Sequence, residues 1–205
     1  MKVLIISGSP HDHGTTMAAV DEMIKVFDAQ GVESEVVCVV KDPVKGCQNC
    51  GACVKLGRCV IDDIVNELAA KVEAADGLVL ASPVYYASPN GAMIAVLDRL
   101  FYTMRCELRG KAACSVAVAR RGGVTTTFDV LNKYIMYGGM SIATGQYWNG
   151  LHGKGYDQAQ EDLEGLQQMR TLANNMVFLM KSLALGKETY GFPERETIVR
   201  TNFIR

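Results

Sequence analysis

The sequence lacks an excess of charge of either sign. Its 21 lysine and arginine residues nearly balance 22 aspartate and glutamate residues, which leaves a net charge of -1. Such a chain has no broad electrostatic attraction for phosphate backbones or for anionic lipid. The composition therefore argues against a general nucleic-acid-binding protein.

Long apolar runs are also missing. No run approaches the roughly 18 residues of a membrane-spanning helix, and the apolar start at residues 2–6 reaches polar Ser7 too soon for a secretory signal. We therefore expect a cytoplasmic protein with no membrane partner. Its seven cysteines would then stay reduced unless they bind metal or take part in catalysis.

What is present is an ordinary globular composition, with 49% hydrophobic and 21% charged residues in a chain of 205. This length predicts one domain, residues 1–186, followed by an arm at residues 187–205. A cysteine-rich loop at residues 43–60 is inserted in the domain.

Short apolar runs alternate with segments of helical spacing along the whole chain. The runs predict five strands, at residues 2–6, 35–40, 77–81, 112–119 and 141–146. Helices are expected between them, Asp62 is the expected N-cap of one, and a last long helix should end close to Gly186. Strands that are apolar throughout indicate a doubly wound α/β fold with a parallel sheet covered on both faces. In the flavodoxin-like order 2-1-3-4-5, ligands bind at the carboxyl ends of strands one and three.

The loop at residues 7–16 joins the first strand to the first helix. Helix N-terminal N–H groups and the hydroxyls of Ser9, Thr15 and Thr16 suit a phosphate. The loop carries neither Gly-x-Gly-x-x-Gly nor Gly-x-x-x-x-Gly-Lys-Ser/Thr. It therefore lacks the sequence signatures of a dinucleotide-binding Rossmann fold and of a P-loop. An open alternative is that Thr15 or Thr16 only caps the helix.

A second loop, residues 82–91, follows the third strand and contains Tyr85 and Tyr86 between two prolines. It could form a rigid apolar wall for a flat aromatic ligand, whose polar edge would meet the backbone of residues 84–86. A plain turn with packed tyrosines is an equally open interpretation.

The cysteine cluster is the least random feature of the sequence. Cys47, Cys50, Cys53 and Cys59 fall within thirteen residues. Such tight spacing lets one loop supply several thiolates to an iron-sulfur cluster. Zinc is less apt, because structural zinc sites usually join two separated pairs of ligands, and unligated or redox-active thiols remain open. The other three cysteines are expected to be small core residues: Cys38, Cys106 and Cys114.

Several short segments match one family in their order and spacing: residues 7–10, 47–53, 82–89, 97–101, 119–123, 145–149 and 199–205. Together they resemble the NAD(P)H-dependent FMN reductase group of the flavodoxin-like superfamily, in particular its iron-sulfur flavoproteins. The resemblance covers nearly the whole chain. It departs from the family pattern where relatives commonly place Arg at His11 and Asn near Thr15.

The resemblance implies a cofactor site made of three loops. FMN would bind its phosphate on the first loop, its isoalloxazine would lie against the second, and the third would approach the other ring edge. The implied residues are Ser9, His11, Thr15, Thr16 and Met17 in the first loop, Pro83, Val84, Tyr85 and Tyr86 in the second, and Arg120, Arg121, Gly122 and Gly123 in the third. It also implies a [4Fe-4S] cluster on Cys47, Cys50, Cys53 and Cys59.

The implied activity is hydride transfer from NAD(P)H to FMN. Electrons would then pass to a quinone, a flavin or another small acceptor, or through the cluster to a ferredoxin-like protein. The arm and the segment with Tyr147 and Trp148 would lie between subunits of a homodimer or homotetramer. Two alternatives are an electron-transfer protein without a substrate of its own and a non-enzymatic thiol or metal sensor.

Overall fold

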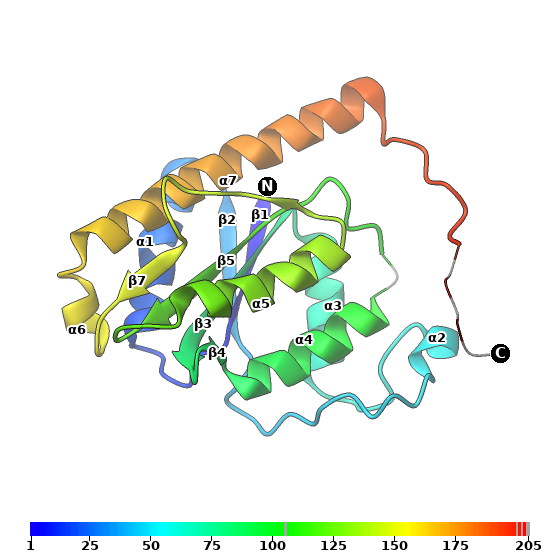
Figure 1. Cartoon of the computed structure of the whole chain (residues 1–205). Coiled ribbons are helices and arrows are strands. Elements are labelled where there is room, and N and C mark those ends of the chain that lie inside the picture. The colour runs from blue at the N-terminus through cyan, green and yellow to red at the C-terminus, as the bar shows by residue number, and fades with distance from the viewer. Residues whose placement is uncertain (105, 200, 202, 204–205) are drawn as a thin grey trace.

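The chain forms a central parallel sheet with helices on both faces (Figure 1). The computed structural model describes residues 1–104, 106–199, 201 and 203. Its strands follow the order β2-β1-β3-β5-β6, which confirms the predicted flavodoxin-like order. These strands are β1 (Lys2–Ser7), β2 (Glu33–Cys38), β3 (Gly77–Tyr85), β5 (Ala112–Ala119) and β6 (Ser141–Ile142).

Seven helices in the described part of the chain connect and cover the strands. α1 (Thr15–Ala29) and α7 (Leu163–Tyr190) pack on one face of the sheet. α3 (Ile64–Ala74), α4 (Gly91–Thr103) and α5 (Val124–Tyr137) pack on the other. The remaining two, α2 (Cys53–Leu56) and α6 (Tyr156–Ala159), are single turns.

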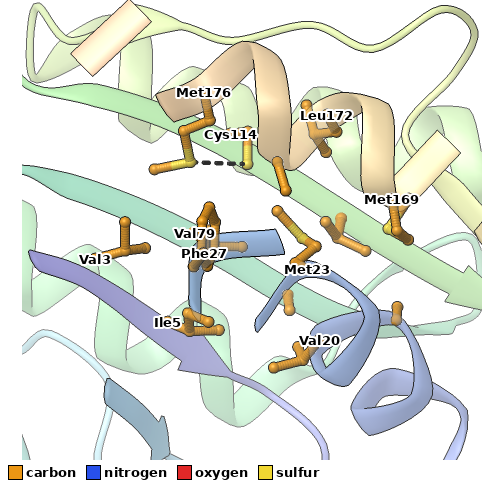
Figure 2. Close-up of a cluster of buried hydrophobic side chains, with 14 of the residues drawn as sticks. Val3, Ile5, Val20, Met23, Phe27, Val79, Cys114, Met169, Leu172 and Met176 are labelled. Atoms are coloured by element: carbon orange, nitrogen blue, oxygen red, sulfur yellow. Dashed lines mark hydrogen bonds between the residues drawn. The ribbon is translucent and has the colours of Figure 1, made fainter. Parts of the chain in front are cut away.

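The two cores follow from the alternation of side chains along each strand. In β1, Val3 and Ile5 face α1 and α7, whereas Leu4 and Ile6 face α3 and α4. Figure 2 shows Phe27 of α1 and Met176 of α7 in one buried cluster on the first of these faces. Each such buried side chain stabilises the fold by about 1.5 to 3 kcal/mol.

The predicted fifth strand at residues 141–146 was wrong in extent. The edge of the sheet consists of two short strands, β6 and β7 (Gly150–His152). β6 pairs with Ala112 and Ala113 at the start of β5, and β7 pairs with residues 117–119 at its end. Residues 143–149, which lie between them, form no strand, so the strand is interrupted where the prediction made it continuous.

The side chain of Gln168 in α7 holds residues 146–149 in place. Its buried Oε1 accepts hydrogen bonds from the backbone N–H groups of Gln146 and Tyr147, both at 3.0 Å. Its Nε2 donates to the Tyr147 carbonyl at 2.7 Å and to Asn149 Oδ1 at 2.9 Å. The amide therefore takes over the role that a neighbouring strand plays elsewhere. A Cβ on Gly145 would overlap the side-chain amide of Gln168, which explains the glycine at that position.

The last helix also differs from its predicted end near Gly186. α7 continues through Gly186 to Tyr190, because a glycine inside a helix costs only about 1 kcal/mol relative to alanine and does not end it. The helix ends at Gly191, which has the positive φ of 70° that favours glycine. Neither α7 nor any other helix of the described residues is long and apolar enough to cross a membrane.

The described part of the arm after α7 returns to its own chain. The Arg109 guanidinium lies 5.1 Å from the Phe192 ring centre and donates to the Pro193 carbonyl at 2.9 Å. Arg195 bonds to Glu107 at 3.2 Å. The expected role of the arm between subunits stays a prediction, and Arg200, Asn202, Ile204 and Arg205 lie outside the described residues.

Replacing Gln168 with alanine is expected to lower the free energy of unfolding by about 1 to 3 kcal/mol, because half-buried backbone groups lose their partners. Urea denaturation measures the change. Gln167→Ala, at the exposed neighbouring position of the same helix, is the matched control and should stay within about 0.5 kcal/mol of the parent. Equal small effects of the two substitutions would contradict the role of Gln168.

Candidate functional site

Three loops meet at the carboxyl edge of the sheet. They follow β1, β3 and β5, which are neighbours and run parallel, so their carboxyl ends lie at one edge. The first loop covers residues 8–14, the second is the turn between β3 and β4 (Ser88–Pro89), and the third covers residues 120–123. These are the loops in which the sequence predicted the site.

The first loop is fixed by its own hydrogen bonds. Ser9 is buried, and its Oγ accepts from the backbone N–H of His11 at 3.2 Å. The Cys38 thiol donates to the Ser9 carbonyl at 3.0 Å. Cys38 is therefore a half-buried hydrogen-bond donor and not the core residue expected, and Cys106 is likewise only half-buried. Cys114 is fully buried as predicted, which raises the pKa of its thiol to about 12.

The N-terminus of α1 is open to an anion. Its N-cap is Gly14, which has no side chain to cap the helix, and the first turn contains no acidic residue. The first backbone N–H groups of α1 thus carry their partial positive charge without a side-chain cap. The alternative that Thr15 or Thr16 caps the helix is wrong, since both lie inside it. The Thr15 hydroxyl instead accepts from the Gly155 N–H at 3.0 Å.

The second loop is a tight, strained turn. Tyr86 and Ala87 link the antiparallel pair β3 and β4 and have φ values of 51° and 56°. Two positive φ values are typical of a type I′ hairpin turn, which normally contains glycine or asparagine. Residues in such strained regions cost of order 1 to 3 kcal/mol each and cluster at functional sites. The Thr126 hydroxyl of α5 holds the turn by donating to the Ala87 carbonyl at 2.9 Å.

The third loop contacts the second through Gly123. A Cβ on Gly123 would lie 2.8 Å from Val84 Cγ1 and 3.0 Å from Ala87 Cα, and the residue has a φ of 93°. A glycine is therefore required for this approach. Gly122 has open space around it, and Arg120 and Arg121 are exposed. The structure thus brings two of the three predicted loops into direct contact.

Residues that the sequence prediction missed lie beside the third loop. A hollow of about 480 Å³ is lined by Arg120, Arg121, His152 and Lys154, among others. His152 and Lys154 belong to a segment for which the sequence predicts no strand or helix, because only pairing with β5 makes residues 150–152 a strand. The hollow therefore collects three basic side chains and the carboxylate of Glu161 at the carboxyl ends of β5 and β7.

The four cysteines of the cluster also come together. Cys47, Cys50, Cys53 and Cys59 all line one small hollow beside the second half of α4. Within residues 1–104, 106–199, 201 and 203, no three His, Cys, Asp or Glu side chains are placed to hold one metal ion. A single zinc ion needs such convergence, whereas a [4Fe-4S] cluster binds each thiolate at a different iron. Four thiols around one hollow are a donor set that a [4Fe-4S] cluster accepts.

Arg99 of α4 connects this cysteine segment to the core. Its guanidinium is buried, and both Nε and Nη2 lie 3.3 Å from Cys59 Sγ. The same group forms a two-pronged ion pair with Asp63 at 2.7 and 2.8 Å. The N-cap of α3 is Asp63 and not the predicted Asp62, since Asp63 Oδ1 accepts from the Val65 N–H. Burial raises the pKa of Asp63, but the bonds from Arg99 and Val65 outweigh it and hold that pKa below its usual value.

The chain is similar in sequence to known flavoproteins. A model of the family described as NADPH-dependent FMN reductase matches residues 1–153. An iron-sulfur flavoprotein of Methanocaldococcus jannaschii is 30% identical over 189 residues, which cover 88% of this chain and 98% of that protein. An iron-sulfur flavoprotein of Methanosarcina thermophila is 29% identical over 193 residues, which cover 92% and 100%.

A solved structure shares the fold at lower sequence identity. RosB with bound 8-demethyl-8-formylriboflavin-5'-phosphate has a TM-score of 0.72 and 18% identity, over 100% of this chain and 92% of that chain. At this level of identity the likeness shows the fold alone.

Replacing Gly123 with alanine is expected to lower the free energy of unfolding by about 1 to 3 kcal/mol, because the new Cβ meets the hairpin and an unfavourable φ. Thermal or urea unfolding measures the loss. Gly122→Ala is the matched control, since its Cβ meets open space. If the two variants are equally stable, the third loop does not pack on the hairpin as described.

Proposed function

The chain belongs to the NADPH-dependent FMN reductase family of flavodoxin-like flavin oxidoreductases, and we propose that it oxidises NAD(P)H through FMN bound at the carboxyl edge of its sheet. The observation that carries the proposal is the uncapped N-terminus of α1 beside a strained hairpin turn. The uncapped helix N-terminus suits a phosphate, and the hairpin turn presents backbone groups in a fixed place.

The first loop would hold the FMN phosphate. Ser9, His11 and residues 15–17 surround the open helix N-terminus, where backbone N–H groups favour an anion. The Thr15 hydroxyl is committed to the segment at residues 153–155, so Thr15 would offer the phosphate its backbone N–H. Most of the favourable charge would come from the helix N-terminus itself.

The second and third loops would hold the ring. FMN, when bound, accepts a hydride from a nicotinamide and passes the electrons to a second substrate. Residues 83–86 would contact one edge of the ring with backbone groups that the hairpin keeps rigid. Gly123 lets the third loop approach, which would bring Arg120 and Arg121 near the ring and favour its more negative, reduced form.

The hollow beside the third loop would receive the nicotinamide nucleotide. Its three basic side chains, Arg120, Arg121 and Lys154, suit the phosphate groups of NAD(P)H. The nearby Tyr147 and Trp148 are exposed aromatic side chains. We propose that these two side chains lie between subunits of a homodimer or homotetramer.

The cysteine segment would hold a [4Fe-4S] cluster. Cys47, Cys50, Cys53 and Cys59 supply four thiols around one hollow, and the relatives in Methanocaldococcus jannaschii and Methanosarcina thermophila are named iron-sulfur flavoproteins. A cluster exchanges single electrons. The electron acceptor would then be a ferredoxin-like protein, and without the cluster a quinone, a flavin or another small molecule.

The flavin site is tested by a carboxylate placed at the N-terminus of α1. Gly14→Asp is expected to lower FMN affinity at least about tenfold, since it occupies the helix N–H groups and repels a phosphate, and to leave riboflavin affinity unchanged. Gly14→Ala, which adds the same Cβ without the charge, is the matched control. Fluorescence titration of the flavin-free chain gives both affinities.

The activity is measured on the FMN-loaded chain as NADPH and NADH oxidation with a quinone or free flavin as acceptor. We expect turnover with at least one of the two nucleotides. FMN bound without any NAD(P)H oxidation would indicate an electron-transfer protein instead. In the flavin titration, a Gly14→Asp variant that loses affinity for FMN and for riboflavin by the same factor would show that the phosphate binds elsewhere.

A further inference from the structure

Arg99 is a buried cation that forms its hydrogen bonds with the cysteine segment, residues 45–63. Its side chain is 1% exposed. Besides Cys59 and Asp63, the guanidinium donates to the carbonyls of Lys45 at 3.2 Å and Ile61 at 3.0 Å. In the described part of the chain, every hydrogen bond of this group therefore goes to residues 45–63, which contain all four cysteines of the cluster. No residue of the flavin loops takes part.

The hydrogen bonds from Arg99 to Cys59 are not needed to hold the cysteine segment against α4. Asp63 already pairs with the guanidinium through both of its carboxylate oxygens, and two carbonyls take further N–H groups. Two N–H groups nevertheless converge on Cys59 Sγ, a poor acceptor as a neutral thiol and a good one as a thiolate ligand. The backbone of Cys59 is held separately by Asn66, at 2.9 and 3.1 Å.

We propose that Arg99 is a positioning residue that orients Cys59 as a cluster ligand and raises the reduction potential of the cluster. Reduction adds one electron and no proton to a [4Fe-4S] cluster, so the site gains one negative charge. A fixed cation that donates two N–H groups to a ligand sulfur stabilises the reduced state more than the oxidised state. The inference rests on the proposed cluster, but not on NAD(P)H oxidation.

Arg58 provides a matched control, because it is the same residue type beside the same cysteine. Its side chain is 63% exposed, and its contact with Asp62 is long, at 3.9 Å. Water screens such a charge strongly. Removing the charge of Arg58 should therefore change the potential far less than removing that of Arg99.

The test compares the full chain, loaded with iron and sulfide under anaerobic conditions, with Arg99→Gln, Asp63→Asn and Arg58→Gln. A mediated redox titration, followed by the electron paramagnetic resonance signal of the reduced cluster, gives the potential. We expect a clear shift to lower potential in Arg99→Gln, a shift to higher potential in Asp63→Asn and little change in Arg58→Gln. Iron loss to a chelator should be several-fold faster in the first two variants.

A purely structural role predicts a different pattern. Arg99→Gln and Asp63→Asn would then lose iron equally fast, with the potential unchanged in both, and this result would overturn the proposal. If Arg99→Gln retains too little iron to titrate, Asp63→Asn decides, because it removes the carboxylate that neutralises Arg99: a raised potential supports the proposal and an unchanged one refutes it. A parent chain that takes up no iron also refutes it, while FMN binding and NAD(P)H oxidation report separately on the reductase activity.

Discussion

The parallel pairing of β1, β3 and β5 is the constraint on which the rest of the structure depends. It brings the ends of three strands to one edge, so that loops distant in sequence become neighbours. The open N-terminus of α1, the strained turn at Tyr86 and Ala87, and the close approach of Gly123 are all built on this edge. The helices pack on both faces and leave the edge free for a ligand.

Most of the fold could be predicted, because buried parallel strands are apolar throughout and their helices repeat every three or four residues. The prediction failed where tertiary contacts override local pattern. The edge strand breaks into β6 and β7 because the side chain of Gln168 replaces a strand partner, and nothing near residues 143–149 reveals that partner. At Gly186 the reason is local instead, because one glycine costs too little to end α7, which continues to Tyr190.

Some parts of the candidate site could be predicted from the sequence, and others could not. The three loops and the four cysteines could be predicted because their residue types and spacing are local in sequence. His152 and Lys154 could not, since a strand of three residues has too little pattern to be recognised. Arg99 lies in one of the segments that resemble the family, yet its contact with Cys59, forty positions away, follows only from the packing of α4 against the cysteine segment.

We propose that one chain holds both a flavin at the sheet edge and an iron-sulfur cluster on its cysteine segment. The direct measurement is the content of FMN, iron and acid-labile sulfide per chain after anaerobic purification. We expect one FMN with about four iron and four sulfide. FMN without iron would contradict the cluster, and a chain with no affinity for FMN would contradict the flavin site and the oxidoreductase activity that depends on it.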